Sequence, residues 1–552
     1  MIQSILVQGT TSKVVVKKKN NSTLIFSLLL FGLTMTILGL PFTKWGFKTD
    51  DFGNIYHCKI NKLSDIGTFF TEGNMERFNH ASNSHSTPQA FFAGLYRPMS
   101  FLYYYAQYLL FGANAYGYFL TTIAFHALNS VLLFNIFIPI AGTLGAFLTA
   151  AFFAFHPSLW NWLGWISAQT YFIELLVLLL LILALKKYLD DKKIIFYLIS
   201  CTLFAMNLFL KEATIILPLW VMPALYLYLE KINKRFLTTL RLSLGYWLVT
   251  VGYAVVRLSM FPLTKDTSSL TFEPTLASFV ARMKSRLFDF VTYFNDLVGL
   301  TALPGNNRLL KGALLLVFFT ALAWLFIHNR EKKWILFLWY STIIFSWPGL
   351  LMHYQPRYSY MALPFFMLSV LMSLRFYEAS YEFKQHKIFT CGLCLIIATH
   401  AYFLFGKLKK REYVLHQVTG AFQTLVQNPT IHNRALCFVG IPCHWFHMGT
   451  AQAMWLLTNN NSYPIYQFNA KICLKNKDNY LAVPALKKNY LTITQNTDNF
   501  VLSSLEEKKL WFLDQSDKKN THATIEIPEE TRKQNPLYIT WDYQLARFKI
   551  LS

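Results

Sequence analysis

Long apolar runs separated by short polar segments make up most of this chain. Runs of roughly 18 or more mostly hydrophobic residues recur from Leu24 to about Phe405, each long enough to cross a bilayer core of about 30 Å as a helix. Because lipid offers the backbone no hydrogen-bond partners, these runs are expected to be helical. The pattern predicts about eleven spans. They begin near Leu24, Gly117, Gly142, Ala168, Ile194, Ala213, Thr238, Leu310, Trp334, Tyr358 and Ile388.

The distribution of lysine and arginine predicts the orientation of these spans. Basic clusters precede the first span and follow the fourth, sixth, eighth and tenth, so on an alternating map they share one side. The positive-inside rule makes that side cytoplasmic, which places the N-terminus inside and the C-terminus outside. The clusters are Lys17, Lys18 and Lys19; Lys186, Lys187, Lys192 and Lys193; Lys231, Lys234 and Arg235; Arg330, Lys332 and Lys333; and Arg375, Lys384 and Lys387.

The map divides the chain into three parts. Residues 1–23 form a cytoplasmic tail, residues 24–408 a transmembrane module, and residues 409–552 a domain outside the membrane. Broken apolar stretches in the outer loops, at about 43–116 and 261–309, predict amphipathic helices on the membrane. Alternating patterns in the last part predict strands at 435–440, 490–494, 524–527 and 538–541 and a helix at 451–457. The predicted fold is an all-α polytopic membrane protein with a small C-terminal α/β domain.

The composition narrows the classes of partner. The 552 residues are 54% hydrophobic and only 14% charged, whereas a soluble protein is about a quarter charged. The net charge of +23 indicates either attraction to anionic lipid or to a polyphosphate-type substrate, or positive-inside anchoring with ordinary surface lysines. Clustering in short loops favours the anchoring interpretation. Dispersal of the basic residues among the spans argues against a nucleic-acid partner.

The seven cysteines show no recognised metal-ligand spacing. Cys391 and Cys394 lie in an apolar run and are interpreted as packing residues. Cys437 and Cys443 suit a disulfide if the C-terminal part faces an oxidising compartment. The sequence indicates no cofactor and leaves a requirement for a divalent metal open.

Two adjacent aspartates, Asp50 and Asp51, stand just beyond the first span in the run Thr49-Asp50-Asp51-Phe52. Acidic residues are scarce in this chain, with 28 against 51 basic ones. Adjacent carboxylates repel each other, which raises the pKa of one of them and favours its action as a base near neutral pH. The pair is therefore the leading candidate for chemistry at the outer membrane surface.

Further polar residues, widely separated in the sequence, fall on the same outer side of the map. Each also has a structural interpretation, as a loop end, a helix cap, a solvated or locally paired turn, or an interfacial anchor. Their shared side favours a common site. They are Arg97, His156, Lys211, Glu212, His353, Arg357 and Tyr358.

Two ionisable residues, His126 and Glu174, fall inside the second and fourth spans. Ionisable groups are costly at this depth and usually face a bundle interior or a cavity. We therefore hypothesise that His126 and Glu174 pair with each other. The nearby run of Trp160, Trp162 and Trp165 indicates an interfacial aromatic belt or a face that stacks on sugars.

Several short motifs occur in an order that resembles the GT-C superfamily of polyprenyl-phosphate-sugar-dependent glycosyltransferases. The resemblance is closest to the bacterial relatives of the TMTC-type protein O-mannosyltransferases and covers residues 24–375, although the chain lacks a tetratricopeptide array after the membrane part. The motifs are Thr49-Asp50-Asp51-Phe52, Tyr96-Arg97-Pro98-Met99-Ser100, Phe125-His126-Ala127-Leu128-Asn129, Phe153-Ala154-Phe155-His156-Pro157, Gly164-Trp165-Ile166-Ser167, Lys211-Glu212 and Arg357-Tyr358-Ser359-Tyr360.

The resemblance implies transfer of a sugar from a polyprenyl phosphate to a lipid, glycan or protein acceptor on the non-cytoplasmic face. It assigns the Asp50/Asp51 pair as the general base that takes the proton of the acceptor hydroxyl. Arg357, assisted by Lys211 or Arg97, is expected to stabilise the phosphate leaving group. The remaining expected donor contacts are His156, Glu212 and Tyr358.

Two other functions fit part of the pattern. A transporter or flippase of a lipid-linked glycan explains the spans, His126 and Glu174, but it explains neither the long outer loops nor the acidic pair, and no inverted repeat is visible. A non-catalytic assembly subunit would use the C-terminal part for binding. The composition, rich in Lys, Asn, Ile and Phe, indicates a low-GC genome. The lack of a tetratricopeptide array favours a bacterial inner membrane, with the endoplasmic reticulum as the alternative.

Overall fold

The structure is a computed structural model that describes most of the helical part and the strands of the C-terminal part. The described residues are 21–60, 62–71, 96–229, 235–260, 291–300, 308–328, 332–351, 359–378, 383–431, 436–439, 453–454, 456–457, 465–472, 481–487, 490–495, 500–504, 522–526, 537–542 and 547–551.

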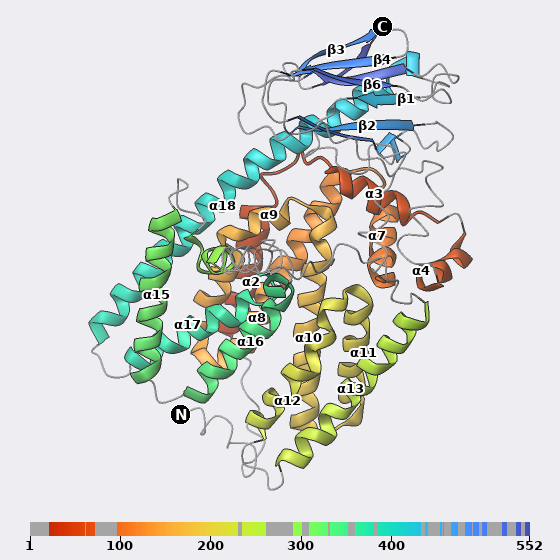
Figure 1. Ribbon diagram of the computed structural model, residues 1–552. Helices are drawn as coiled ribbons and strands as arrows, with labels where there is room; N and C mark the ends of the chain where they lie inside the picture. The colour runs from red at the N-terminus through yellow and green to blue at the C-terminus, as the bar shows by residue number, and fades with distance from the viewer. Residues whose placement is uncertain are drawn as a thin grey trace, which may run out of the picture.

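Long helices form the body of the molecule (Figure 1), and they begin close to the predicted spans. Within the described residues, four apolar segments are long enough to cross a membrane: Ala115–Leu159, Ile166–Asp191, Arg235–Ser259 and Thr390–Val426. Shorter apolar helices accompany them, so the number eleven stays a prediction. The helices are α2 (Asn21–Leu38), α8 (Ala115–Ala154), α10 (Gln169–Asp191), α11 (Ile194–Leu210), α12 (Leu217–Tyr228), α13 (Arg235–Met260), α15 (Arg308–His328), α16 (Lys332–Leu351), α17 (Leu363–Glu378) and α18 (Phe383–Val426).

Helix α8 contains the positions of two predicted spans. Gly142 interrupts it with a φ of 70° and a ψ of 170°. A residue with a Cβ adopts a positive φ only with strain, so glycine suits the break. Pro139, one turn earlier, removes a backbone donor and weakens the helix at the same place. The break at Gly142 separates two helical segments, and it lies where the sequence predicts a new span to begin.

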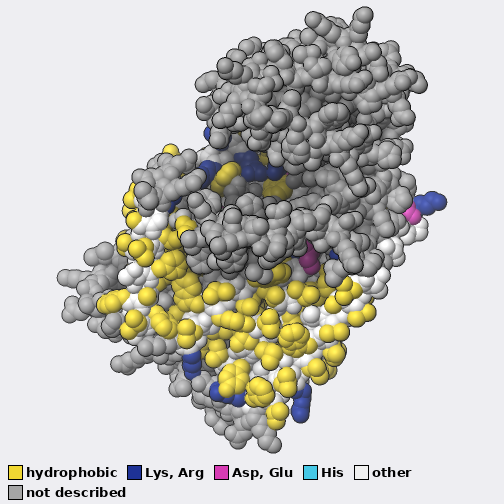
Figure 2. All heavy atoms as spheres, viewed as in Figure 1, with side chains coloured by type: hydrophobic (Ala, Val, Ile, Leu, Met, Phe, Trp, Pro, Cys, Tyr) yellow, Lys and Arg dark blue, Asp and Glu magenta, His cyan; other side chains and the backbone are white. Residues whose placement is uncertain are grey.

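The surface of the helical body is apolar where a bilayer would contact it. Figure 2 shows a broad field of hydrophobic side chains, with lysine and arginine side chains above and below it. Exposed apolar side chains occur on α2, α13 and α15, among them Leu28, Leu248 and Val317. By contrast, α10 lies in the interior, since 72% of the residues in its apolar stretch are buried. An apolar field bounded by basic side chains is typical of a protein that spans a membrane.

Short helices occupy the first predicted outer loop. They are α3 (Thr49–His57), the 3-10 helix η1 (Leu63–Gly67), α4 (Thr68–Thr71) and α7 (Pro98–Phe111). Helices α3 and α4 both contact α7, and Figure 1 shows all three together on the side of the body that faces the strands. Most of the second predicted loop, residues 261–290 and 301–307, lies outside the described residues.

The C-terminal part contains two sheets. One has the order β5-β2-β1-β7-β8 and the other the order β3-β4-β6. Strand β1 pairs in parallel with β2, and a parallel pair requires a crossover connection. Helical residues lie in that connection, at 453–454 and 456–457, within the predicted helix at 451–457. The complete α/β character stays a prediction, because much of this part lies outside the described residues.

Four of the strands coincide with the strands predicted from the alternating patterns, namely β1, β4, β6 and β7. The strands among the described residues are β1 (Leu436–Val439), β2 (Ile465–Ile472), β3 (Leu481–Lys487), β4 (Tyr490–Gln495), β5 (Phe500–Ser504), β6 (His522–Glu526), β7 (Leu537–Asp542) and β8 (Arg547–Leu551).

Helix α18 runs past the predicted end of the transmembrane module at residue 408 and continues to Val426. Its two cysteines, Cys391 and Cys394, are free and exposed, so the prediction that they are packing residues is wrong. The far half of the helix packs against the chain that follows α2. At Gly46 this approach is so close that an added Cβ would lie 2.0 Å from the Leu415 carbonyl oxygen.

The close approach at Gly46 gives a test of this packing. Gly46→Ala should destabilise the protein by about 1–3 kcal/mol, because the new methyl group meets backbone rather than a flexible side chain. Gly32→Ala is the matched control, since nothing lies within 4 Å of a Cβ added at Gly32 on α2. Thermal unfolding of the purified protein in detergent measures both. Equal unfolding midpoints for the two variants would contradict the packing described.

Candidate functional site

The Asp51 carboxylate links α3 to the loop that precedes α10. Asp51 is fully buried, at 0% exposure. Its Oδ2 accepts a hydrogen bond from the Lys48 backbone N–H at 2.9 Å. Its Oδ1 accepts from both the backbone N–H and the hydroxyl of Ser167, each at 2.8 Å. Donors of this kind stabilise a buried carboxylate in its charged form and hold it in one orientation.

A second layer of hydrogen bonds holds the Ser167 loop. Asn54 Nδ2 donates to the Ser167 hydroxyl at 2.8 Å. The Tyr104 hydroxyl on α7 donates to the carbonyls of Ile166 and Ser167, at 3.3 Å and 3.2 Å. Burial, and after it the Asp51 charge, raises the pKa of Tyr104 well above its usual range. Tyr104 therefore stays a donor at any physiological pH.

The structure describes one of the two predicted carboxylates in full. Asp50 lies in the first turn of α3, but its side chain is outside the described set. Asp51 and the Gly164–Ser167 motif, which were predicted separately, meet directly. The roles of Ser167 and Tyr104 were missed, because hydroxyl groups at these positions carry no local signal of what they contact.

Arg97 and Glu212 form a paired fork beside this network. Arg97 Nε donates to Glu212 Oε2 at 2.8 Å, and Arg97 Nη2 also contacts Glu212 Oε1. Burial alone would lower the pKa of Arg97, but the Glu212 carboxylate outweighs it and raises the pKa. Glu212 therefore pairs with Arg97, the N-cap residue of α7.

Lys211 faces a different carboxylate. Its Nζ lies 3.9 Å from Glu174 Oε2 and over the ring of Tyr171. Both charged side chains are buried, and a cavity of about 20 Å³ adjoins them, next to Trp347. A space of this size holds about one water molecule.

The predicted pairing of His126 with Glu174 is wrong. His126 Nδ1 lies 2.9 Å from the Tyr360 hydroxyl, and Nε2 lies 3.0 Å from the Ala154 carbonyl. Asn129 donates to the same tyrosine hydroxyl at 3.2 Å. These bonds join the two halves of α8 to the start of α17. The buried histidine thus has a structural partner that lies more than two hundred residues away.

His156 caps a short 3-10 turn, η2 (Pro157–Leu159), with its Nδ1 2.7 Å from the Ser158 hydroxyl. Its ring lies 5.8 Å from the ring of His400, a residue of α18 that the sequence did not single out. Both rings also contact Phe152, at 5.8 Å and 4.9 Å between centroids.

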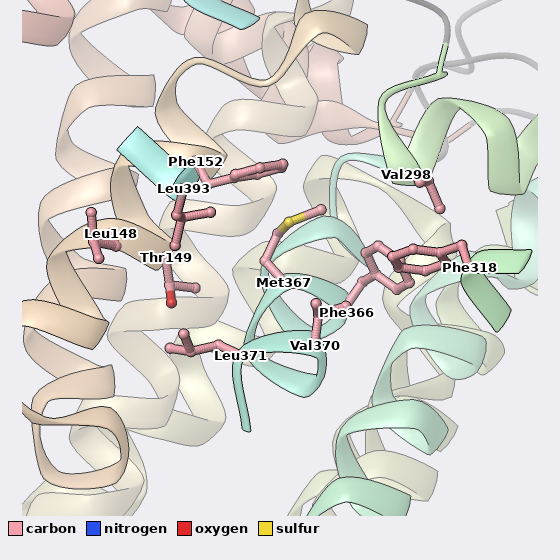
Figure 3. A pocket seen from close by; sticks show the side chains of 10 residues that line it. All are labelled: Leu148, Thr149, Phe152, Val298, Phe318, Phe366, Met367, Val370, Leu371 and Leu393. Carbon is pink, nitrogen blue, oxygen red and sulfur yellow. The ribbon is translucent and has the colours of Figure 1, made fainter. Parts of the chain in front are cut away.

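Phe152 lines an apolar cavity between α8, α15, α17 and α18, shown in Figure 3. The cavity has a volume of about 90 Å³. Its lining is apolar apart from one threonine. The lining residues are Leu148, Thr149, Phe152, Val298, Phe318, Phe366, Met367, Val370, Leu371 and Leu393.

The remaining predicted site residues, His353, Arg357 and Tyr358, lie outside the described residues. Trp162 is 1% exposed and packs on Tyr360, so it belongs to the core and not to an interfacial belt. Among the described residues, no group of three or more His, Cys, Asp and Glu side chains could hold a metal ion.

Comparison with known proteins gives distant structural neighbours only. No protein-family model and no curated protein matches the chain. The archaeal oligosaccharyltransferase AglB from Archaeoglobus fulgidus, in complex with an inhibitory peptide and a dolichol-phosphate, is similar over 81% of this chain, with 10% identity and a TM-score of 0.42. The chain covers 65% of the length of that protein.

ArnT from Cupriavidus metallidurans is a second neighbour. Its apo structure shares 11% identity over 81% of this chain and 85% of its own length, with a TM-score of 0.43. The structure of ArnT bound to undecaprenyl phosphate shares 12% identity over 81% of this chain and 86% of its own length, with a TM-score of 0.41. Similarity at TM-scores below 0.5 carries no functional argument, so the proposal below rests on the residues of this chain.

A double-mutant cycle measures the coupling between Arg97 and Glu212. Arg97→Gln and Glu212→Gln should each destabilise the protein, and the coupling energy should be about 1–3 kcal/mol, as expected for charge-assisted, part-buried hydrogen bonds. The control cycle uses the exposed pair Lys186 and Asp190, for which about 0.5 kcal/mol or less is expected. Thermal or denaturant unfolding gives the stabilities of the wild type, the two single variants and the double variant in each cycle. Equal coupling in the two cycles would show that the fork contributes no more than a surface pair.

Proposed function

We propose that this chain is an integral-membrane glycosyltransferase of the GT-C type. It transfers a sugar from a polyprenyl phosphate to a lipid, glycan or protein acceptor at the outer surface of a bacterial inner membrane. One observation carries the proposal: the acidic motif beyond the first apolar helix is fixed, through Asp51, to the Gly164–Ser167 motif. Two motifs of the resemblance, more than a hundred residues apart, thereby meet at one point.

The reaction requires a base and a stabilised leaving group. The acceptor hydroxyl attacks the anomeric carbon, its proton passes to a carboxylate, and the bond between that carbon and the phosphate oxygen breaks with inversion. Asp51 is fully buried and accepts hydrogen bonds through both carboxylate oxygens. We therefore assign it to positioning, and we assign proton transfer to Asp50, its neighbour in α3.

The charge of the leaving phosphate has to be met by a cation. Arg97 pairs with Glu212, and Lys211 Nζ lies 3.9 Å from Glu174 Oε2, so a carboxylate already stands beside each of these cations. We therefore assign phosphate binding chiefly to Arg357, with Tyr358 beside it in the sequence. His156 and His400 are further candidates, because both rings adjoin the apolar cavity through Phe152. The cavity is apolar, as an isoprenoid chain requires, but its volume of about 90 Å³ is below the roughly 300–1,000 Å³ of typical ligand pockets, so it has room for only a small part of such a chain.

The transporter alternative loses one of the two residues on which it rested. A relay through the membrane needs ionisable groups that exchange partners, whereas both ring nitrogens of His126 have partners within the helical body. Orientation of the termini and the count of about eleven spans remain predictions from the lysine and arginine distribution.

The acidic pair provides the main test. Asp50→Asn should lower transfer roughly 10²–10⁴-fold without unfolding the protein, as expected for loss of a general base. Asp51→Asn should lower both activity and thermal stability, because an amide NH₂ would replace one of the accepting oxygens. Transfer from labelled polyprenyl-phosphate sugars in proteoliposomes measures activity. Full activity of the double variant would refute the proposal.

Arg357→Ala is expected to lower kcat/KM for the lipid-linked donor at least about tenfold, because a charge contact to the leaving group is lost. Arg357→Lys retains the charge and should recover part of the loss. Steady-state kinetics with varied donor concentration give both values. Donor kinetics unchanged from the wild type would leave Arg357 as an interfacial anchor.

A further inference from the structure

We propose that α18 is a positioning element for the reaction, because it holds from one helix both chain segments that bind the Asp51 carboxylate. The role in catalysis rests on the proposed function, whereas the contacts made by α18 are independent of it. The residues concerned are Arg411, Glu412 and Thr419. They lie beyond residue 408, in the part that the sequence assigned to a separate domain.

The first segment is the chain that enters α3. The Phe47 backbone N–H donates to the Thr419 hydroxyl at 2.8 Å. The Lys44 backbone N–H donates to Glu412 Oε1 at 2.8 Å. Both acceptors are buried, at 7% and 4% exposure. The residue next to Phe47 is Lys48, which supplies the N–H to Asp51 Oδ2.

These contacts form one stripe along α18. Glu412, Leu415 and Thr419 are spaced three and four residues apart, which places them on one face of the helix. Between the two hydrogen bonds, Gly46 lies against the Leu415 carbonyl with no room for a Cβ. Farther along, the rings of Phe422 and Phe52 lie 5.7 Å apart. The helix therefore follows the entering chain from before α3 into its first turn.

The second segment is the loop that ends at Ser167. Arg411 Nε donates to the Gly164 carbonyl at 2.9 Å. A Cβ at Gly164 would lie 2.5 Å from Arg411 Cδ, so the arginine stem packs directly on the glycine. Three residues later, Ser167 donates twice to Asp51 Oδ1. One turn of α18 thus contacts the chain on both sides of the carboxylate.

The consequence is a division of roles. Asp51 is held by Lys48 and Ser167, and α18 fixes where those two donors stand. A shift in α18 would move the acidic motif relative to the donor sugar, and a displacement of about 1 Å can lower the rate about 10²-fold. Arg411, Glu412 and Thr419 are positioning residues, because they act through the backbone and touch neither substrate.

Thr419→Val is the sharpest variant, because it preserves shape and removes the acceptor of the Phe47 N–H. It should lower kcat about tenfold or more while the donor KM changes less than about twofold, and Thr419→Ser should restore most of the rate. Thr424→Val is the matched control, since the Thr424 hydroxyl bonds only locally on α18, to the Gly420 carbonyl. Equal loss in the Val and Ser variants, or an unchanged kcat in Thr419→Val, would overturn the proposal.

Hydrogen exchange read by mass spectrometry tests the geometry without any assay of transfer. Peptides that cover residues 44–52 should exchange faster in Thr419→Val than in the wild type, and should be unchanged in Thr424→Val. If Thr419→Val does not fold, Glu412→Leu against Glu412→Gln gives the same comparison at Lys44. A wild type that transfers no sugar would refute the proposed function, while exchange still decides the role of α18. Unchanged exchange in both Thr419→Val and Glu412→Leu would refute that role.

Discussion

The buried charge of Asp51 is the constraint on which the arrangement of this site depends. A carboxylate without water is stable only when nearby donors replace its hydration. Lys48 and Ser167 supply those donors, and they come from segments that lie more than a hundred residues apart in the sequence. The entry to α3, the turn before α10 and the contacts of α7 all have to be in place before the charge is accommodated. The requirement couples local folding of each segment to the assembly of the whole.

The same requirement governs the neighbouring cations. The part-buried Arg97 pairs with Glu212, and the buried Lys211 lies beside Glu174, so each of these cations has a carboxylate close to it. A low dielectric strengthens such pairs and makes an unpaired member costly. These charged side chains are therefore held in place before any ligand binds.

The sequence predicted what depends on local pattern. Apolar runs located the long helices, alternating residues located β1, β4, β6 and β7, and scarcity of acidic residues pointed to Asp51. It did not predict partners across the fold. His126 bonds Tyr360, and Thr419 bonds the chain before α3, because such choices depend on helix packing and leave no periodic trace. The assignment of α18 failed for the same reason: polar residues after residue 408 read as a tail, although one face of the helix is buried.

The length of α18 has a consequence for how the molecule can be divided. A truncation at residue 408, where the apolar stretch of the sequence ends, would keep the apolar helices and remove Arg411, Glu412 and Thr419. The N–H groups of Lys44 and Phe47 and the Gly164 carbonyl would then lose their partners together. The border that the sequence predicts at residue 408 therefore falls inside one continuous helix, whose contacts with the helical body extend at least to Phe422.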